Sequence, residues 1–377
     1  MSNQIATSSA NELGLLFLTI ALAIVFWASS CSSSRQAGDP EPQVNPAPGA
    51  VELFAAESDE DAGLPGPDIV TEDGNTTGNI RTYRIPGSSV TFEMITVRGG
   101  TFKLGTPEKA RDREDDESPQ LEVSVDGFLM GRYEVTYDEY SIFQYANRDS
   151  DSTAVDGIRM DVDAIARPSP PYEDPAHGMG GNDYPAVGMT QWGALHYAKW
   201  LSDKTGEFFR LPTEAEWEYA CKTGAADNSA SNASSGLSTS AWFDSNSDYR
   251  LHQVGQKRAN ALGIFDLLGN AAEWTLDQYD KGFYAELVSG DRHNPWRLPD
   301  RLHPRTVRGG AYDDGLSVLR CSSRQESSIN WKKRDPQIPK SFWWNTDSPF
   351  VGFRLVRPNE QPDVGEQEAF WLTVLGE

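Results

Sequence analysis

Residues that bind transition metals are scarce in this sequence. None of its three cysteines forms a CxxC pair, which excludes a zinc ribbon. The five histidines are scattered and form no HxxxH or HExxH pattern, so the sequence offers no histidine-based metal site. The cysteines are Cys31, Cys221 and Cys321.

Positive charge is also in short supply. The 377 residues include 33 Lys and Arg against 56 Asp and Glu, which gives a formal net charge of −23. Nucleic acids and anionic lipid surfaces repel a chain of this charge, so we expect no nucleic-acid partner. The chain is rich instead in Trp, Tyr, Phe, Gly and Pro. That mixture is typical of a loop-rich globular core and not of a helical bundle or coiled coil.

The long hydrophobic run in the chain is Leu13 to Ala28. Its 16 residues are few for a membrane span but typical of the hydrophobic region of a signal peptide. Small residues and then Cys31 follow, so residues 1–31 resemble a bacterial lipoprotein signal with Cys31 as the lipidated residue. The segment before Leu13 lacks Lys and Arg, and the alternative is a short, uncleaved membrane anchor. Both interpretations place the rest of the chain outside the cytoplasm.

The lipoprotein interpretation predicts an envelope protein held to the membrane by its N-terminal lipid. In a Gram-negative envelope, Ser32 is compatible with sorting to the outer membrane. Residues 32–82 contain few large apolar side chains and are predicted to be a disordered, acidic and Pro-rich tether. The acidic run Glu57–Gly63 is typical of a solvated linker.

Alternating apolar and polar residues predict short strands from about Tyr83 onward. Ser89–Thr106 alternates on both sides of Gly99-Gly100, which predicts a β-hairpin. Two more strands are predicted within Leu121–Thr136. The segment Arg305–Arg324 is predicted to form two strands joined by a Gly-Gly turn, and Phe350–Arg357 is predicted to be the closing strand.

Helix starts are predicted at three threonines. Thr136 and Thr190 precede runs with helical spacing, and Thr213 is followed by Glu216 in a capping box. Gly206 is expected to end the second helix. The whole pattern predicts an α+β fold with short antiparallel strands, long loops and two main helices.

The segment Gly263–Asp277, GIFDLLGNAAEWTLD, has the spacing of neither a helix nor a strand. The residues Asp266, Gly269, Ala271 and Glu273 fall at i, i+3, i+5 and i+7. In a tight turn, two carboxylates and two backbone carbonyls at this spacing form an all-oxygen shell of the kind that calcium prefers. The alternative, which spacing alone favours, is a buried Gly-Asn turn whose acids accept hydrogen bonds from neighbouring backbone N–H groups.

Eight segments in a fixed order carry a family resemblance: GGTFKLGT, LMGRYEVTYDEY, YPAVGMTQWGALHYAKWLS, FRLPTEAEWEYA, NALGIFDLLGNAAEW, VRGGAY, LRCSSR and VGFRLVR. Together they resemble the formylglycine-generating-enzyme, or sulfatase-modifying-factor, domain family. The resemblance covers about Val90 to Pro358 and implies a compact, loop-rich α+β domain, related to C-type lectins, over residues 83–358. An acidic tail over residues 359–377 would follow, and its apolar patch, Ala369–Leu375, is predicted to be either a docked strand or a binding segment.

The resemblance also implies site residues. Asp266, Gly269, Ala271 and Glu273 match the calcium loop of calcium-binding members, so structural Ca²⁺ is expected there. Cys221 and Cys321 match two cysteines that pair in the family, which implies a disulfide. The alternative is two buried free thiols.

The catalytic pattern of the family is broken in this chain. Formylglycine-generating enzymes hold Cu(I) with two thiolates between the Gly-Gly turn and the R-C strand. Here that segment is AYDDGLSVL, with Asp314 and Leu316 near the thiolate positions, so no copper is expected. Asp313 completes an acidic pair, and Ala272 replaces a tryptophan that lines the family's active site. These residues mark the candidate cleft: Ala272, Asp313, Asp314 and Leu316.

The leading hypothesis is therefore a lipid-anchored, non-catalytic domain that binds a protein or glycan, or that assembles into an envelope, secretion or gliding machinery. Its surface would be formed by the loops 148–181, 222–240, 280–304 and 325–349. Their aromatic residues would contact the ligand or, alternatively, pack in the core: Trp296, Trp331, Trp343 and Trp344. The rival hypothesis is an oxidoreductase of the family, or a related enzyme, in which Asp313 and Asp314 supply altered chemistry.

Overall fold

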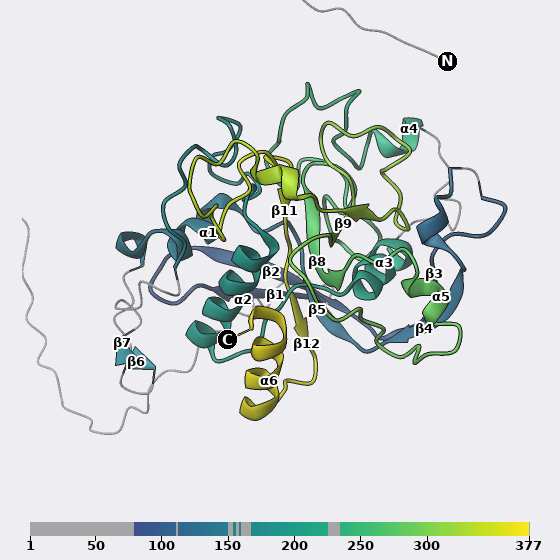
Figure 1. Cartoon of the computed structure of the whole chain (residues 1–377), viewed down its shortest axis with the longest axis horizontal. Coiled ribbons are helices and arrows are strands. Elements are labelled where there is room, and N and C mark those ends of the chain that lie inside the picture. Colours follow the sequence, from purple (N-terminus) through teal and green to yellow (C-terminus); the bar gives the residue numbers. More distant parts are fainter. Residues whose placement is uncertain are drawn as a thin grey trace, which may run out of the picture. The chain divides into compact units, whose positions relative to one another are not determined.

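Two four-stranded β-sheets organise the part of the chain that the computed structural model describes (Figure 1). The described residues are 79–376, without 111, 150–153, 156–157, 160–166 and 225–233. The predicted signal peptide, Cys31 and nearly all of the predicted tether therefore lie outside them. Within the described ranges, no helix has the length and apolarity needed to cross a membrane.

The first sheet has the strand order β1-β2-β5-β12 and is antiparallel throughout. Its first strand begins at Ile80, slightly before the predicted start of order at Tyr83. Every residue of the inner strand β5 is buried. The strands are β1 (Ile80–Arg84), β2 (Thr91–Val97), β5 (Phe128–Gly131) and β12 (Val356–Pro358).

The second sheet has the strand order β10-β9-β8-β11 and contains one parallel pair, β8 with β11. All seven residues of β8 are buried. The prediction that Gly263–Asp277 is neither helix nor strand is wrong for its second half, because a strand covered on both faces does not alternate. The strands are β8 (Ala272–Gln278), β9 (Arg305–Arg308), β10 (Gln325–Glu326) and β11 (Val351–Gly352).

The predicted hairpin over Ser89–Thr106 is wrong in its pairing. Its strands β2 and β3 (Gly100–Leu104) both form, but β2 pairs with β1 and β5, whereas β3 pairs with β4 (Leu121–Val125). A Cβ on Gly99 would lie 2.7 Å from Gly127 N, so the two inter-strand turns pack directly on each other. Alternation predicts the faces of a strand but not its partner, which explains the error.

Two other predicted strands differ from the structure. Within Arg305–Arg324 only β9 forms, and the next strand, β10, begins at Gln325. The predicted closing strand over Phe350–Arg357 is divided into β11 and β12, which belong to different sheets. The chain thus passes from the second sheet to the first between Gly352 and Val356.

The three predicted helices form with the predicted caps. The hydroxyls of Thr136 and Thr213 accept from the backbone N–H groups of Glu139 and Glu216 in complete capping boxes. The Thr190 hydroxyl accepts from Gly193 N, and Gly206, with φ of 68°, ends the second helix. The helices are α1 (Tyr137–Gln144), α2 (Gln191–Thr205) and α3 (Glu214–Thr223).

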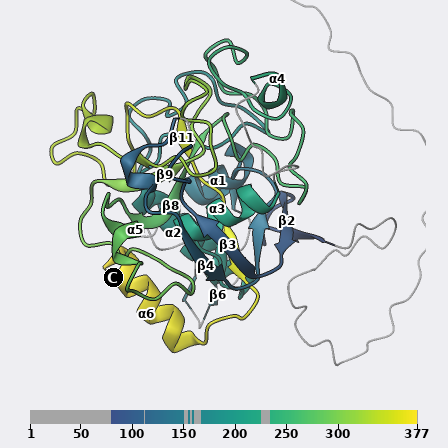
Figure 2. The same ribbon diagram turned by 90° about the vertical axis from the view of Figure 1, so that its right-hand side faces the viewer.

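The C-terminal segment is a helix, α6 (Val364–Leu375), so the docked-strand alternative for Ala369–Leu375 is wrong, whereas the binding-segment alternative stays a prediction. Asp363 and Glu366 form its capping box. Trp371 and Val374, spaced i and i+3, are buried, and the helix packs against α2 (Figure 2). The smaller elements are η1 (Asp115–Glu117), η2 (Ala146–Arg148), β6 (Ala154–Val155), β7 (Ile158–Arg159), α4 (Ser234–Leu237), α5 (Phe283–Glu286) and η3 (Ile329–Lys332).

The predicted disulfide is present. Cys221, near the end of α3, is bonded to Cys321, which is 100 residues further along the chain. In the chain-entropy model, closing a loop of this length stabilises the folded state by roughly 4.7 kcal/mol.

Glu139 is a buried carboxyl in the first turn of α1. Its Oε1 accepts from the backbone N–H of Thr136 at 3.0 Å and from the Thr136 hydroxyl at 2.9 Å. Burial raises the pKa of Glu139 to about 7, although these two hydrogen bonds oppose the shift. The folded chain therefore favours the neutral carboxyl.

We predict that Glu139 reduces stability as the pH rises. Its folded-state pKa is above the unfolded value, so its stabilising contribution is present below about pH 4.5 and lost as the pH passes 7. The loss is on the order of 2–3 kcal/mol. Gln at this position keeps the acceptor oxygen without the charge. Urea unfolding from pH 4.5 to 8 should show E139Q gaining stability relative to wild type by this amount.

A matched control is available in α6. Glu366 has the same role in a capping box: its backbone N–H donates to Asp363 Oδ1, and its carboxylate accepts from Asp363 N, but its side chain is exposed. The stabilities of E366Q and wild type should therefore run parallel across this pH range. Parallel curves for E139Q as well would contradict the prediction.

Candidate functional site

A buried ion pair joins Glu273 of β8 to Arg354. Neither side chain is exposed, and Arg354 Nη2 lies 2.6 Å from Glu273 Oε1. Arg354 Nε donates to both carboxylate oxygens, and Trp217 Nε1 donates to Oε2 at 2.8 Å. Arg354 also donates to the backbone oxygens of Gly131 and Phe265 at 2.9 Å. Protein donors thus satisfy the Glu273 carboxylate, as a buried charge requires.

Glu134 supplies a second buried carboxylate beside this pair. Its oxygens accept from Ala271 N and Asn270 Nδ2, each at 2.8 Å. Burial, and then the carboxylates of Asp266 and Glu273, raise the pKa of Glu134 well above its usual range. Glu134 lies in another segment of the chain, and its side chain therefore holds the Gly269-Asn270 turn in place.

Asp266 is the third acid of this cluster. Its backbone is left-handed, with φ of 54°, a conformation that Asp tolerates better than most residues. One oxygen, Oδ2, accepts from Gly255 N at 2.7 Å, whereas Oδ1 is buried and has no hydrogen-bond partner. Burial raises the pKa of Asp266 to about 6. Three carboxylates thus surround the single guanidinium of Arg354, and one of their oxygens is unsatisfied.

The four residues predicted to bind calcium lie in this one segment. Glu273 already accepts from Arg354 and Trp217, and Ala271 N donates to Glu134. In the ranges that the structure describes, no three Asp, Glu, His or Cys side chains are arranged to hold a metal ion. Asp266 Oδ1 remains an acceptor of the kind that a hard cation would satisfy. The predicted ligands are Asp266, Gly269, Ala271 and Glu273.

A second buried ionic network connects α3 to β9 and the segment after it. Arg324 Nε and Nη2 donate to the two oxygens of Glu214 at 2.7 and 2.9 Å. Arg308 pairs with Glu218, and all four side chains are buried. Although burial opposes it, Arg324 and Arg308 hold the pKa of Glu214 below its ordinary value. Helix capping predicted α3 from the sequence, but nothing local indicated these partners.

The turn after Gly309-Gly310 contains three of the four predicted cleft residues, Asp313, Asp314 and Leu316. Asp314 Oδ2 accepts from Ala311 N at 2.9 Å and from Gln325 Nε2 at 3.3 Å, so this carboxylate closes a turn. Asp313 is exposed. Leu316 is also exposed, whereas Ala272 is buried in β8, so these two do not share one solvent-accessible surface.

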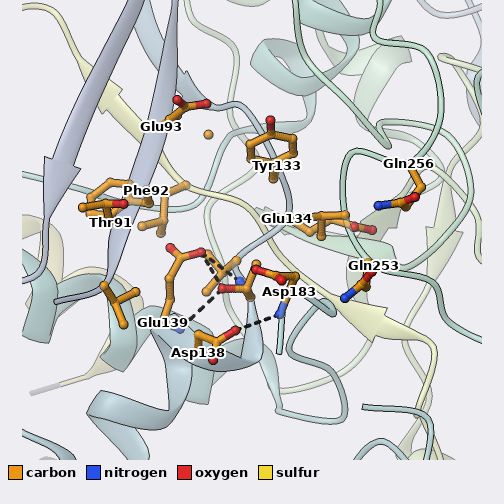
Figure 3. A pocket seen from close by; sticks show the side chains of 16 residues that line it. Thr91, Phe92, Glu93, Tyr133, Glu134, Asp138, Glu139, Asp183, Gln253 and Gln256 are labelled. Carbon is orange, nitrogen blue, oxygen red and sulfur yellow. Dashed lines mark hydrogen bonds between the residues drawn. The ribbon is translucent and has the colours of Figure 1, made fainter. Parts of the chain in front are cut away.

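A groove of about 540 Å³ lies between β2, the start of α1 and residues 253–256 (Figure 3). Its lining includes no Lys or Arg, so it favours a cationic group over an anionic one. Sequence reasoning missed it because its acids come from separate segments that only the fold brings together. Those acids are Glu93, Glu134, Asp138, Glu139 and Asp183.

The four tryptophans considered for an aromatic binding face pack against the protein. Trp344 is buried, and its Nε1 donates to Ser169 O at 2.8 Å. Trp296, Trp331 and Trp343 are partly buried against the main core cluster. The packing alternative stated for these residues is therefore the one that the structure supports.

Comparison with known proteins places this geometry in a family. Residues 86–359 match the sulfatase-modifying factor enzyme 1-like domain, close to the predicted limits of 83 and 358. The formylglycine-generating enzyme of Bos taurus is 25% identical over 289 residues, which cover 65% of this chain and 73% of that enzyme. The serine/threonine-protein kinase Pkn1 of Chlamydia caviae is 29% identical over 248 residues, which cover 63% of this chain. The chain spans only 35% of that kinase, so the two share a domain and not a whole protein.

Solved structures agree in fold. PvdO from Pseudomonas aeruginosa has a TM-score of 0.54 and 23% identity, with 76% of this chain and 100% of PvdO covered. Treponema denticola variable protein 1 has a TM-score of 0.50 and 22% identity, with 74% of this chain and 99% of that protein covered. Together with the match over residues 86–359, this agreement leads to one conclusion: the chain belongs to the sulfatase-modifying-factor domain family and has its mixed α and β fold.

Proposed function

We propose that this chain is a non-catalytic member of the family that binds a partner in the cell envelope. The observation that carries the proposal is the disulfide between Cys221 and Cys321, which are the two cysteines of the family domain. A Cu(I) site needs soft thiolate ligands, and a disulfide supplies none. The residues near the family's thiolate positions, Asp314 and Leu316, do not fit copper either.

The rival proposal, an enzyme with altered chemistry at the acidic pair, has less support. Asp314 is committed to Ala311 N and Gln325, and Asp313 is exposed beside it. A general acid or base needs a free carboxyl within reach of a bound substrate. The hydrogen bonds of Asp314 instead support the role of a turn-closing residue.

The proposed setting is the envelope, with a lipid on Cys31 as the anchor and, in a Gram-negative cell, sorting to the outer membrane. A protein or glycan would be the ligand, and an assembly such as a secretion or gliding machinery would be the context. The net charge of −23 favours partners other than nucleic acid. Loops carried on a rigid core are the usual place for such contacts.

We predict that the chain does not oxidise peptide cysteine. The purified full chain, supplied with copper and oxygen, should form no formylglycine on a cysteine peptide that a formylglycine-generating enzyme converts. The same enzyme serves as the positive control. The variant C221A/C321A is assayed in parallel, because it cannot show activity from thiols released when the disulfide is reduced. Product formed by wild type and by this variant above a copper-only blank would refute the non-catalytic proposal.

We predict that C31S abolishes lipid attachment. In cells fed a labelled fatty acid, wild type should be labelled and recovered with membranes, whereas C31S should be unlabelled. C221A/C321A keeps Cys31 and should be labelled like wild type. Membrane recovery of unlabelled C31S would favour the uncleaved anchor of residues 13–28 instead.

We also propose that Ca²⁺ binds at Asp266, with the backbone oxygens of Gly269 and Ala271 as further donors, whereas the predicted ligand Glu273 stays paired with Arg354 and Trp217. The support is the unpartnered Asp266 Oδ1 and the excess of carboxylates over cations around it. Calcium would supply the missing positive charge and hold the turn before β8. The alternative is that Asp266 or Glu134 is protonated, which would also reduce the excess negative charge.

We predict that calcium stabilises the folded chain. At pH 7.5, 1 mM CaCl₂ should raise Tm by several degrees over EGTA, because binding at about 100 Kd contributes about 2.7 kcal/mol. D266N should lose most of this shift, and D313N, which changes an exposed acid, should keep it. Equal Tm values of wild type in calcium and EGTA would rule the site out.

A further inference from the structure

Arg305, the first residue of β9, is a largely buried cation whose donors are not satisfied. Its Nε and Nη1 are buried and have no hydrogen-bond partner. The carboxylate that acts on it, Asp300, is 64% exposed and lies 3.6 Å from Arg301 Nε. Burial lowers the pKa of Arg305 to about 10, which still leaves it charged at neutral pH. A buried guanidinium normally has an anion or acceptors around it, so this one lacks a counterpart.

His303 adds another donor on the same side of the chain. Its Nδ1 lies 2.9 Å from Ser327 Oγ, which also accepts from Arg305 N at 2.8 Å. When the Ser327 hydroxyl donates to Nδ1, the ring proton is on Nε2. That nitrogen is buried and has no hydrogen-bond partner. Ser327 therefore positions the backbone of Arg305 and the ring of His303 together.

Both side chains line one small cavity of about 30 Å³. Two polar groups in its lining are used elsewhere: Thr190 Oγ1 donates to Phe342 O at 2.6 Å, and Gln191 Nε2 donates to Thr275 O at 2.5 Å. The rest of the lining is apolar: Trp192, Leu195, Trp274, Leu302 and Val374. The unsatisfied groups at this cavity are thus cationic or hydrogen-bond donating.

A second cation adds to the positive charge of Arg305. Lys332 is buried and donates to Ser341 O at 2.7 Å. Burial, and then the charges of Lys332 and Arg305, lower the pKa of His303 to about 4. The net charge of the chain is −23, yet positive charge is concentrated beside this cavity. The apolar surroundings strengthen the attraction between that charge and a bound anion.

We propose that this cavity binds an oxyanion group, a carboxylate, sulfate or phosphate, carried by an organic ligand. Arg305 supplies a positive charge and two donors without partners, Nε and Nη1, and His303 Nε2 supplies a further donor. The cavity has room for the anionic head alone. Leu302, which is 48% exposed, and Trp192, which is partly exposed, offer the body of the ligand an apolar surface at the margin. This site does not depend on the proposed non-catalytic role.

The test uses two probes that share the anionic head. Full-length chain is titrated with sodium sulfate and with sodium benzenesulfonate by calorimetry, with ionic strength held constant by NaCl. Both should bind, and benzenesulfonate at least tenfold more tightly, because its ring covers Trp192 and Leu302. Equal affinities would indicate a free-ion site and count against a ligand-borne group.

Variants assign the binding to the cavity. R305Q should weaken both probes at least tenfold, whereas R301Q, which removes a neighbouring exposed guanidinium, should leave binding unchanged. If R305Q does not fold, H303Q is compared in its place and should weaken both probes. Unchanged affinity in R305Q or H303Q, or no binding by wild type, would overturn the proposal. Binding that appears only in D300N would also overturn it, because Asp300 would then be the occupant.

Discussion

The ion pair between Glu273 and Arg354 is the interaction on which the rest of the structure depends. Arg354 lies between β11 and β12, where the chain passes from the second sheet to the first, and it donates to Gly131 of β5 and to Phe265 as well as to Glu273. Trp217 brings α3 to the same carboxylate. Because both charges are fully buried, loss of Arg354 would leave Glu273 uncompensated, at a cost of about 3–5 kcal/mol. One pair therefore fixes both sheets and a helix relative to one another.

Features that depend on residues close together in the chain were predicted correctly from the sequence. Features that depend on contacts between distant residues were not. Helix starts at Thr136, Thr190 and Thr213 were correct because a cap and its partner are three residues apart. Strand pairing was wrong at Ser89–Thr106 because β2 pairs with β1 and β5 and β3 pairs with β4, all of which lie outside that segment. The α6 helix was missed although a capping box precedes it and Trp371 and Val374 have helical spacing, because a short apolar run such as Ala369–Leu375 does not by itself distinguish a strand from a helix.

The same division holds for the candidate sites. The family resemblance located the disulfide and the segment around Asp266, because these residues lie in motifs. It could not indicate that Glu134 joins that segment from another part of the chain. Arg305 was also out of reach, because a basic residue at the start of a strand is usually solvated. Its burial becomes visible only when Ser327 and the segment before β9 are placed beside it.

The scaffold and the binding surfaces of this chain are built from different charges. In the interior, Glu273, Glu214 and Glu218 are each paired with an arginine. The excess of acid is left for surfaces such as the groove in Figure 3. An anion approaching the Arg305 cavity must therefore cross a repulsive field before it meets a favourable one. That field disfavours small free anions, and salt screens it beyond about a Debye length. A ligand with one anionic group on a neutral, apolar body meets the least repulsion for the same contact with Arg305. The net charge of the chain thus favours some oxyanions over others before they reach the cavity.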